Sequence, residues 1–178
     1  RFMFEFIYAK KNLEIFKKVI RKLRENNVNY YNGIDLRILS KITDDYYIIV
    51  YNKIEIGLIY TFSFSEFSDI DCEACSDNNG NSDLDIAYLI MKEFQGKGLG
   101  KIMIKEFVKE MINLYPGLKK IGACVSDLNP ASRKVLEYNN FKRIDYCNES
   151  FCYINKGRKE IGQRYIRDLN DWIYRINR

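Results

Sequence analysis

Two hydrophobic periodicities alternate along the chain and predict its secondary structure. Aromatic residues at every second position, from Phe2 to Tyr8, predict a first strand. Apolar residues three or four positions apart predict helices, because such residues share one helical face. The first helix follows Asn12, a residue type that can cap a helix N-terminus. The stripe Leu13, Phe16, Ile20 and Leu23 marks this helix, and further helices are predicted over 33–40, 98–114, 130–139 and 158–176.

Short apolar runs between turn residues predict the remaining strands. Residues 46–51 and 54–64 form a predicted hairpin around the turn Asn52-Lys53. Strands are also predicted over 85–91 and 121–126, and a second hairpin pairs 141–147 with 151–154. Because runs of consecutive strands mix with helical crossovers, the fold class is α+β with a mixed sheet, not a doubly wound parallel sheet.

The length and composition predict one soluble domain. The 178 residues suit a single domain, 1–178, in which 156–178 form a C-terminal helical extension. The sequence has neither an apolar run long enough for a membrane span nor a secretion leader, so we expect a cytoplasmic protein with no membrane partner. The net charge of +5 is mild and the basic residues are spread out, so we expect no nucleic-acid partner.

The residue types exclude several kinds of catalytic site. Histidine is absent, which removes Ser-His and Cys-His nucleophile pairs and zinc sites built on imidazole. Among the five cysteines, Cys72 and Cys75 have CxxC spacing, but Cys124, Cys147 and Cys152 supply no second CxxC. We therefore expect reduced thiols and no metal site.

Acidic residues gather in one stretch that contains no Lys or Arg, from Glu66 to Asp85. Such a stretch can concentrate a polycation, and its attraction weakens as salt rises. It can equally be a solvated surface loop, which the turn-rich residues 77–82 also favour. The acidic residues are Glu66, Asp69, Asp71, Glu73, Asp77, Asp83 and Asp85.

A glycine-rich segment joins a predicted strand directly to an amphipathic helix. It reads Gln95-Gly96-Lys97-Gly98-Leu99-Gly100-Lys101. Glycines at alternate positions expose successive backbone N–H groups at the positive end of a helix, a geometry that receives phosphate. The spacing fits neither GxxxxGK[ST] nor GxGxxG, so neither the P-loop nor the dinucleotide-binding fingerprint is present. From the glycines alone, a turn without a ligand remains an equal alternative.

The pattern Q-x-x-G-x-G between a strand and a helix resembles motif A of the GNAT superfamily of N-acetyltransferases. The segment from Asn129 through Leu136 and Glu137 to Asn140-Phe141 resembles its motif B, with Asn140 where Gly is usual. The resemblance covers 85–144 well and the rest of the chain by element order. It implies the GNAT fold, a central mixed twisted sheet of about seven strands flanked by four helices, plus a C-terminal helix.

The resemblance also implies acetyl-CoA as cosubstrate and indicates which residues bind it. The glycine-rich segment would bind the pyrophosphate through backbone N–H groups, with Gln95 shaping the turn. The strand before it would pair its backbone with the pantetheine arm, which Asn129 would hydrogen-bond. The cations near the phosphates remain open among Lys97, Lys101, Arg133 and Lys134. The implied cofactor-binding residues are Tyr88, Leu89, Ile90, Gln95, Gly96, Lys97, Gly98, Leu99, Gly100, Lys101 and Asn129.

The catalytic residues are harder to transfer from the resemblance. The family's usual motif B tyrosine is matched by Leu136, and the glutamate of one branch is matched by Cys124. Asp85-Ile86-Ala87-Tyr88 instead resembles the E-I-G-Y of the RimJ/RimL-like branch, whose relatives include aminoglycoside acetyltransferases. We therefore predict Asp85 as base, directly or through water, and Ser132 near the thiol, with Tyr138 as a further candidate acid. Asp85 as a strand-end carboxylate bonded to a loop, and Ser132 as an ordinary helix residue, remain alternatives.

The predicted function is transfer of an acetyl group from acetyl-CoA to a primary amine. The acidic stretch favours a cationic small molecule, such as an aminoglycoside or a polyamine, as acceptor. Two alternatives remain: a protein N-terminal or lysine acetyltransferase, and a non-catalytic acyl-CoA-binding module, which Leu136 and Cys124 favour. We expect a monomer or a homodimer, and the terminal helix with Trp172 could close the core, form the dimer contact or cover the acceptor site.

Overall fold

The computed structural model describes residues 3–26, 46–62, 82–126, 129–144, 152–155 and 158–169. The helix predicted over 33–40, the acidic residues from Glu66 to Asp77, Cys72, Cys75, Cys147 and Trp172 lie outside the described residues. None of the helices in the described ranges is both long enough and apolar enough to span a membrane.

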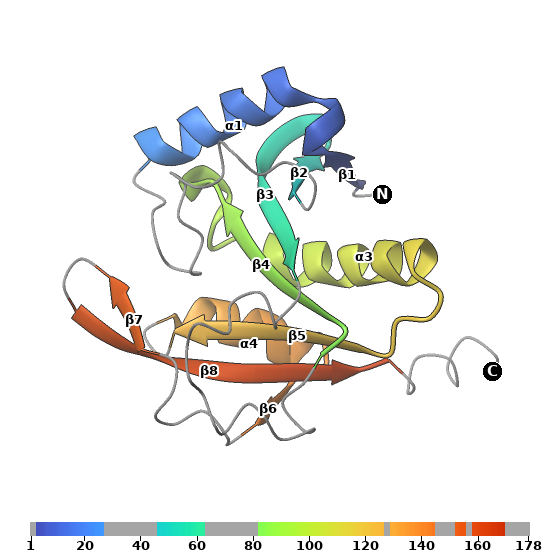
Figure 1. Cartoon of the computed structure of the whole chain (residues 1–178). Coiled ribbons are helices and arrows are strands. Elements are labelled where there is room, and N and C mark those ends of the chain that lie inside the picture. The colour runs from blue at the N-terminus through green and yellow to red at the C-terminus, as the bar shows by residue number, and fades with distance from the viewer. Residues whose placement is uncertain are drawn as a thin grey trace.

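A twisted mixed sheet forms the centre of the fold (Figure 1). Its strand order is β1-β2-β3-β4-β5-β8-β6, and β7 pairs with β8 beside that path. Neighbouring strands are antiparallel except β4 and β5, which are parallel, so the predicted mixed sheet is confirmed. The strands are β1 (Phe4–Tyr8), β2 (Tyr46–Tyr51), β3 (Ile54–Phe62), β4 (Leu84–Ile90), β5 (Lys120–Ser126), β6 (Lys142–Ile144), β7 (Cys152–Asn155) and β8 (Arg158–Asp168).

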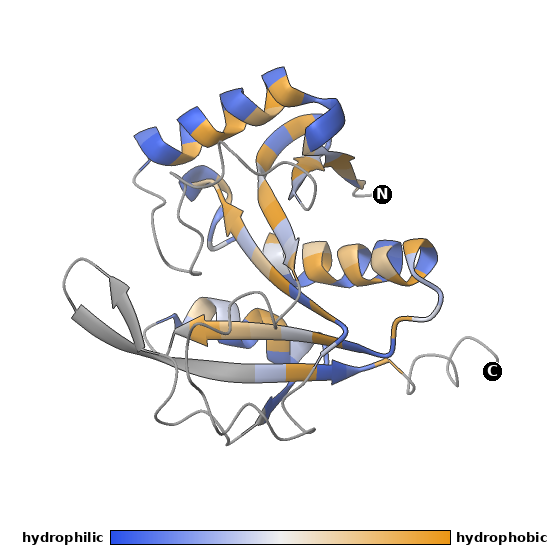
Figure 2. Cartoon of the chain, in the orientation of Figure 1, coloured by the Kyte–Doolittle hydropathy of each residue, from blue (hydrophilic) through white to orange (hydrophobic). Residues whose placement is uncertain are grey.

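The helices of the described residues cover both faces of the sheet. They are α1 (Leu13–Glu25), α3 (Leu99–Leu114) and α4 (Pro130–Tyr138), with 3-10 turns at Ala9–Lys11 and Lys92–Phe94. Asn12 precedes α1 as predicted, but its side-chain amide donates to the carbonyl of Tyr8 and does not cap the helix. Figure 2 shows how apolar and polar residues alternate along α1, β3 and β4.

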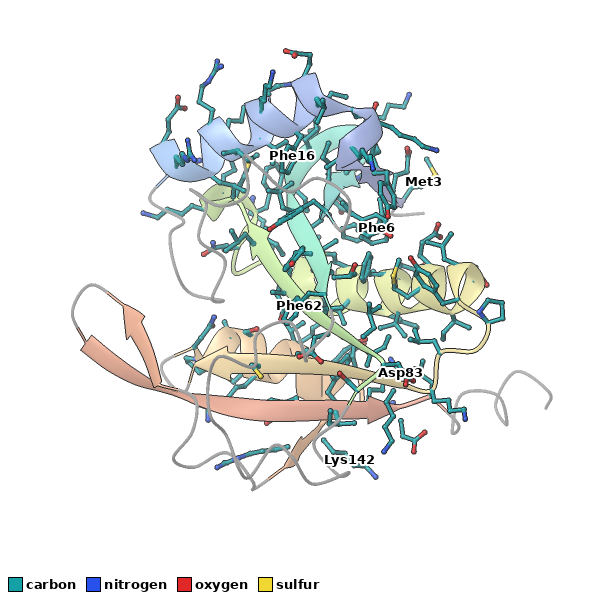
Figure 3. All side chains as sticks on the ribbon, viewed as in Figure 1. Met3, Phe6, Phe16, Phe62, Asp83 and Lys142 are labelled. Carbon is teal, nitrogen blue, oxygen red and sulfur yellow. The ribbon has the colours of Figure 1, made fainter. Side chains whose placement is uncertain are left out.

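Side chains of β4 alternate between two separate cores because successive strand residues point to opposite faces. Ala87 and Leu89 pack with α1, whose Phe16 lies between the helix and the sheet (Figure 3). Ile86 and Tyr88 pack on the other face with Phe107 of α3 and with α4. Strand β4 is therefore buried on both sides along its length.

Strands β4 and β5 separate after a short contact. Their pairing in the described residues consists of Leu84 with Ile121 and Asp85 with Gly122. Beyond this point the strand partner of β4 within the described ranges is β3, as far as Ile90, and β5 pairs with β8. Figure 1 shows the two strands close together at one end and apart at the other. A split therefore opens in the middle of the sheet, toward the carboxyl ends of both strands.

Asp83 fixes the end where the two strands meet. Its Oδ2 accepts the backbone N–H of Lys119 at 2.8 Å and that of Lys120 at 2.9 Å. Figure 3 labels Asp83 at the start of β4, beside the beginning of β5. The carboxylate thus joins the two strands at the closed end of the split.

The helix predicted over 158–176 is wrong for the described part, because Arg158–Asp168 is strand β8. It pairs with the whole of β5, from Lys120 with Asp168 to Ser126 with Gly162, and also with β6 and β7. The apolar residues Ile161, Tyr165 and Leu169 have the spacing of a helical face, but Gly162 lowers helix propensity. The backbone groups of β5, β6 and β7 also need hydrogen-bond partners, which a strand supplies and a helix does not. The second predicted hairpin is wrong for the same reason, since β6 and β7 both pair with β8 and not with each other.

Candidate functional site

A cavity of about 500 Å³ lies where β4 and β5 have separated. Three segments form its wall: the end of β4, the glycine-rich turn that leads into α3, and the first turns of α4. The lining residues are Tyr88, Leu89, Ile90, Phe94, Gln95, Gly96, Gly98, Leu99, Gly100, Lys101, Asn129, Ala131, Ser132, Lys134 and Val135.

The glycine-rich turn needs glycine for its backbone conformation. Gly96 has φ +73° and Gly98 has φ +74°, in the left-handed region that other residues enter at a cost. A Cβ on either glycine would meet no atom within 4 Å, so the space beside the turn is open. Gly98 is the N-cap residue of α3, and no side chain among the described residues caps the helix there. The positive end of α3 therefore faces the cavity through a bare backbone.

Gly100 has a different role, which is close packing of α3 against α4. A Cβ there would lie 3.0 Å from Cγ2 of Val135. Gln95 holds the other end of the turn, because its Nε2 donates to the carbonyl of Ile90 at 2.8 Å. The turn is thus tied both to the end of β4 and to α4.

Lysine side chains provide the positive charge of the cavity. Lys101 and Lys134 are the charged residues of the lining, whereas Lys97 and Arg133 do not contribute to it. The Lys101 ammonium lies 5.0 Å from the ring centroid of Tyr138, and the Lys97 ammonium lies 5.8 Å from that of Phe94. These cation–π contacts hold the Lys97 ammonium near Phe94, just before the turn, and the Lys101 ammonium near the end of α4.

Asn129 fixes the start of α4 in the cavity wall. Its Oδ1 accepts the backbone N–H of Ser132 at 3.1 Å, and Pro130 occupies the first turn of the helix. Both features favour a helix N-terminus at this position. The cap sets the position of Ser132 relative to β4.

A buried pair of hydroxyl groups connects β4 with α4. The Tyr88 Oη and the Ser132 Oγ are 2.7 Å apart, and the two residues are 7% and 6% exposed. Burial raises the pKa of Tyr88 far above its ordinary value, although the hydrogen bond with Ser132 partly opposes the shift. Tyr88 therefore keeps its proton at any pH at which the protein works.

Asp85, the predicted base, lies outside the cavity wall. It is fully buried at the start of β4 and accepts a hydrogen bond from the Ser82 hydroxyl. By strand alternation it shares its face with Ala87 and Leu89, the α1 face, and lies about 10 Å along the strand from Tyr88. The structure does not bring Asp85 and Ser132 together on one face.

Tyr138, the further candidate acid, is also outside the cavity wall. It is 59% exposed near the end of α4, whereas Leu136 is fully buried in the core. The Tyr138 hydroxyl is therefore not part of the pair formed by Tyr88 and Ser132, and Leu136 has no hydroxyl to contribute.

The cavity includes all the predicted cofactor-binding residues except Lys97. Sequence reasoning missed Phe94, Ala131 and Val135 in its wall. Helical spacing could have found two of them, because Ala131 and Val135 are four residues apart and share a face with Ser132. The described residues contain no group of three or more acidic or thiol side chains that could hold a metal ion. Cys124 is half-buried on β5.

Comparisons with known proteins agree with this geometry. A family model described as an acetyltransferase (GNAT) domain matches residues 21–142. No curated protein sequence matches the chain.

Solved structures similar to this chain have the same fold at low sequence identity. One is the aminoglycoside acetyltransferase AAC(6')-Ib, in complex with coenzyme A and kanamycin, at 15% identity, TM-score 0.60 and 98% coverage of both chains. A second is the Salmonella typhimurium protein yncA with acetyl-CoA, at 14% identity and TM-score 0.62, covering 95% of this chain and 94% of that one. A third is the spermidine/spermine N-acetyltransferase of Vibrio cholerae, at 18% identity and TM-score 0.62, covering 98% and 99%.

Proposed function

Because the chain belongs to the GNAT family of N-acetyltransferases, whose acetyl donor is acetyl-CoA, we propose that its acceptor is a primary amine of a cationic small molecule. Aminoglycosides and polyamines are the two chemical classes that fit best. The cavity at the split between β4 and β5, which ends at the glycine-rich turn of α3, supports the donor. The observation that carries the cationic acceptor is the acidic stretch from Glu66 to Asp85.

The residues around the cavity fit the donor. The turn from Gly96 to Gly100 would hold the pyrophosphate with backbone N–H groups, and the open space beside both left-handed glycines leaves room for it. The cavity is within the size range of small-molecule sites. The end of β4 has no strand partner on its β5 side among the described residues, so the amide-rich pantetheine arm can pair with it. Lys101 and Lys134 supply charge for the phosphates.

The reaction needs a neutral amine to attack the thioester carbon. An amine of pKa about 10.4 is neutral in only about one molecule in 10³ at pH 7, which costs roughly 4–5 kcal/mol. Removal of the amine proton is therefore the step that a protein side chain helps most. The C–N bond forms, the C–S bond breaks with its electron pair going to sulfur, and the amine proton leaves.

Asp85 is the proposed acceptor of that proton, either directly or through water. Its carboxylate lies on the α1 face of β4, opposite Tyr88, so the amine would approach from the face that does not carry Ser132. Asp85 pairs with Gly122 at the closed end of the split, so a relay through bound water would lead the proton along β4 from the cavity to this carboxylate. Replacement of Asp85 by Asn should lower turnover and leave coenzyme A affinity unchanged.

The acidic stretch supports a cationic acceptor. Glu66 to Asp85 contains seven carboxylates and no Lys or Arg, and Asp83 and Asp85 place its last residues at the closed end of the split. A stretch of this charge attracts polycations where it is exposed to solvent, and the attraction falls as ionic strength rises. The similarity to structures of enzymes named for aminoglycosides and for spermidine/spermine points in the same direction.

The test is release of coenzyme A, followed with a thiol reagent, in the presence of acetyl-CoA and a panel of amines. The panel contains an aminoglycoside, spermidine, a basic peptide, an acidic peptide and a neutral amine. We expect turnover with the aminoglycoside or spermidine, with a KM that rises with salt. Turnover with peptides alone would replace this proposal with a protein acetyltransferase. Tight acetyl-CoA binding without turnover would indicate a non-catalytic module, which the buried Leu136 on α4 would favour.

A further inference from the structure

Two side-chain amides hold the two ends of the glycine-rich turn, one on the β4 side and one on the α3 side. On the β4 side, Gln95 donates to the carbonyl of Ile90. On the α3 side, the Nδ2 of Asn139, which follows the last residue of α4, donates to the backbone carbonyl of Lys101 at 3.0 Å. The sequence motifs assign a role to Gln95 but none to Asn139.

The partners of Asn139 fix the orientation of its side chain. Asn139 is 4% exposed, and its Nδ2 donates to the carbonyl of Val135 at 2.9 Å as well as to that of Lys101. An amide nitrogen has two hydrogens to donate, whereas an amide oxygen only accepts. Because both partners are carbonyl oxygens, the nitrogen must point toward them, and a flipped amide would place a third acceptor there. Asn139 therefore bridges α3 and α4 in one orientation.

The bond to Lys101 sets a position, because the carbonyl does not need it as a partner. Lys101 lies in the first turn of α3, where each carbonyl accepts the backbone N–H four residues further along the helix. A carbonyl oxygen has two lone pairs, so it can accept Asn139 in addition. Gly100, one residue earlier, also brings the helices close, since a Cβ there would lie 3.0 Å from Cγ2 of Val135. Asn139 and Gly100 thus fix the first turn of α3 against the last turn of α4.

The glycine-rich turn depends on such anchors at its ends. A Cβ on Gly96 or Gly98 would meet no atom within 4 Å, so the middle of the turn is not confined by packing beside these two residues. Gly98 is the N-cap residue of α3, so the backbone N–H groups that follow it take their direction from the first turn of this helix. A displacement of that turn would move them relative to the cavity.

We propose that Asn139 is a positioning residue for the diphosphate of coenzyme A. It is not among the residues that line the described cavity, and it acts through the carbonyl of Lys101. By holding the first turn of α3, it keeps the backbone N–H groups of the glycine-rich turn directed at the diphosphate. The inference rests on the proposed binding of coenzyme A at this turn, and it does not depend on which amine is the acceptor.

Asn139→Leu tests the proposal, because leucine has the same branched outline and no hydrogen to donate. Calorimetry measures the affinity for coenzyme A, and phosphorus NMR follows the two diphosphate signals in protein saturated with coenzyme A. We expect the affinity to fall about tenfold, which corresponds to about 1.4 kcal/mol. Both signals should move from their wild-type bound positions toward those of free coenzyme A. A purely stabilising role would lower Tm and leave the signals of the saturated complex unchanged.

Asn139→Ser separates the two hydrogen bonds and serves as the test if Asn139→Leu does not fold. A serine hydroxyl can donate to the carbonyl of Val135, four residues earlier in the chain, but is too short to reach that of Lys101. This variant should lose as much affinity as Asn139→Leu.

Asn12→Leu is the matched control. The Nδ2 of Asn12 also donates to a backbone carbonyl, that of Tyr8 at 3.2 Å, but Asn12 is not part of the described cavity wall. The control should keep the wild-type affinity and the wild-type phosphorus signals.

The outcomes separate the inference from the proposal on which it rests. If the wild type binds no coenzyme A, or binds it with the diphosphate signals at their free positions, binding at the turn is refuted and the inference fails with it. If the wild type binds with shifted signals and an Asn139 variant keeps either the affinity or the signals of the wild type, only the inference is overturned. An equal loss in Asn12→Leu also overturns it, because the effect would then not be local to α3 and α4.

Discussion

Gly57 is the point at which β3 comes closest to the part of β4 that lines the cavity. It pairs with Ile90, and a Cβ at this position would lie only 2.0 Å from the carbonyl oxygen of Leu89. The nearest atoms are backbone atoms, which cannot rotate away as a side chain can. Cβ atoms essentially never come closer than 3.0 Å to another heavy atom. Gly57→Ala must therefore move either β3 or the backbone of Leu89 by about 1 Å.

The displacement has two measurable consequences. Overpacking of this kind costs about 1–3 kcal/mol, and in a domain of this size each kcal/mol lowers Tm by about 2–4 °C. The same shift moves the backbone of Leu89 and Ile90, which we propose pairs with the pantetheine arm. Coenzyme A affinity should fall at least about tenfold, which corresponds to about 1.4 kcal/mol.

Thermal unfolding and calorimetry with coenzyme A measure the two effects. Gly117→Ala is the matched control, because a Cβ on Gly117 meets no atom within 4 Å and its φ is not positive. That variant should keep both Tm and affinity. If Gly57→Ala also keeps both, the close approach of β3 to Leu89 does not exist in solution and the reasoning is refuted.

Three further predictions follow from the contacts described above. Gly96→Ala and Gly98→Ala should each cost about 1–2 kcal/mol, because the left-handed conformation is strained for alanine, and should weaken coenzyme A binding in calorimetry. Asp83→Ala should lower the free energy of urea unfolding by about 0.5–1.5 kcal/mol, since the exposed backbone N–H groups of Lys119 and Lys120 lose their shared acceptor; Asp83→Ala with unchanged stability would show that the carboxylate does not join the strands. Tyr47 and Tyr88 both have raised pKa values in the folded state, so the unfolded chain releases protons first and stability should fall as pH rises above about 10. Tyr88→Phe should reduce the slope of that fall, measured by urea titration at each pH.

The sequence predicted an element correctly where the spacing of its apolar residues and its packing in the fold favour the same secondary structure. The alternating residues of β1 and the apolar stripes of α1 and α3 have the spacing of the elements that they form. It failed at β8, where an apolar spacing that suits a helix is overridden by pairing with β5 and β6. Strand pairing joins residues far apart in the chain, so no local window shows it.

The same distinction holds for the candidate site. The turn from Gln95 to Lys101 could be predicted because its glycines stand at alternate positions within one short segment that follows a strand. The contact of Tyr88 with Ser132 could not, because it depends on how closely α4 approaches β4. Asp85 lies outside the cavity wall because it is at the start of β4, whereas the end of that strand forms the wall. Strand alternation also puts Asp85 on the opposite face of β4 from Tyr88.

The split between β4 and β5 gives this sheet edges in its interior as well as at its margins. An edge strand accepts any extended backbone of suitable length, whether or not it belongs to a nucleotide. A short strand-like peptidomimetic without phosphate should therefore compete for the proposed pantetheine channel, and anchoring it to an anion at the α3 terminus would add selectivity. The opening that we propose admits the cosubstrate is in this sense also the natural starting point for an inhibitor.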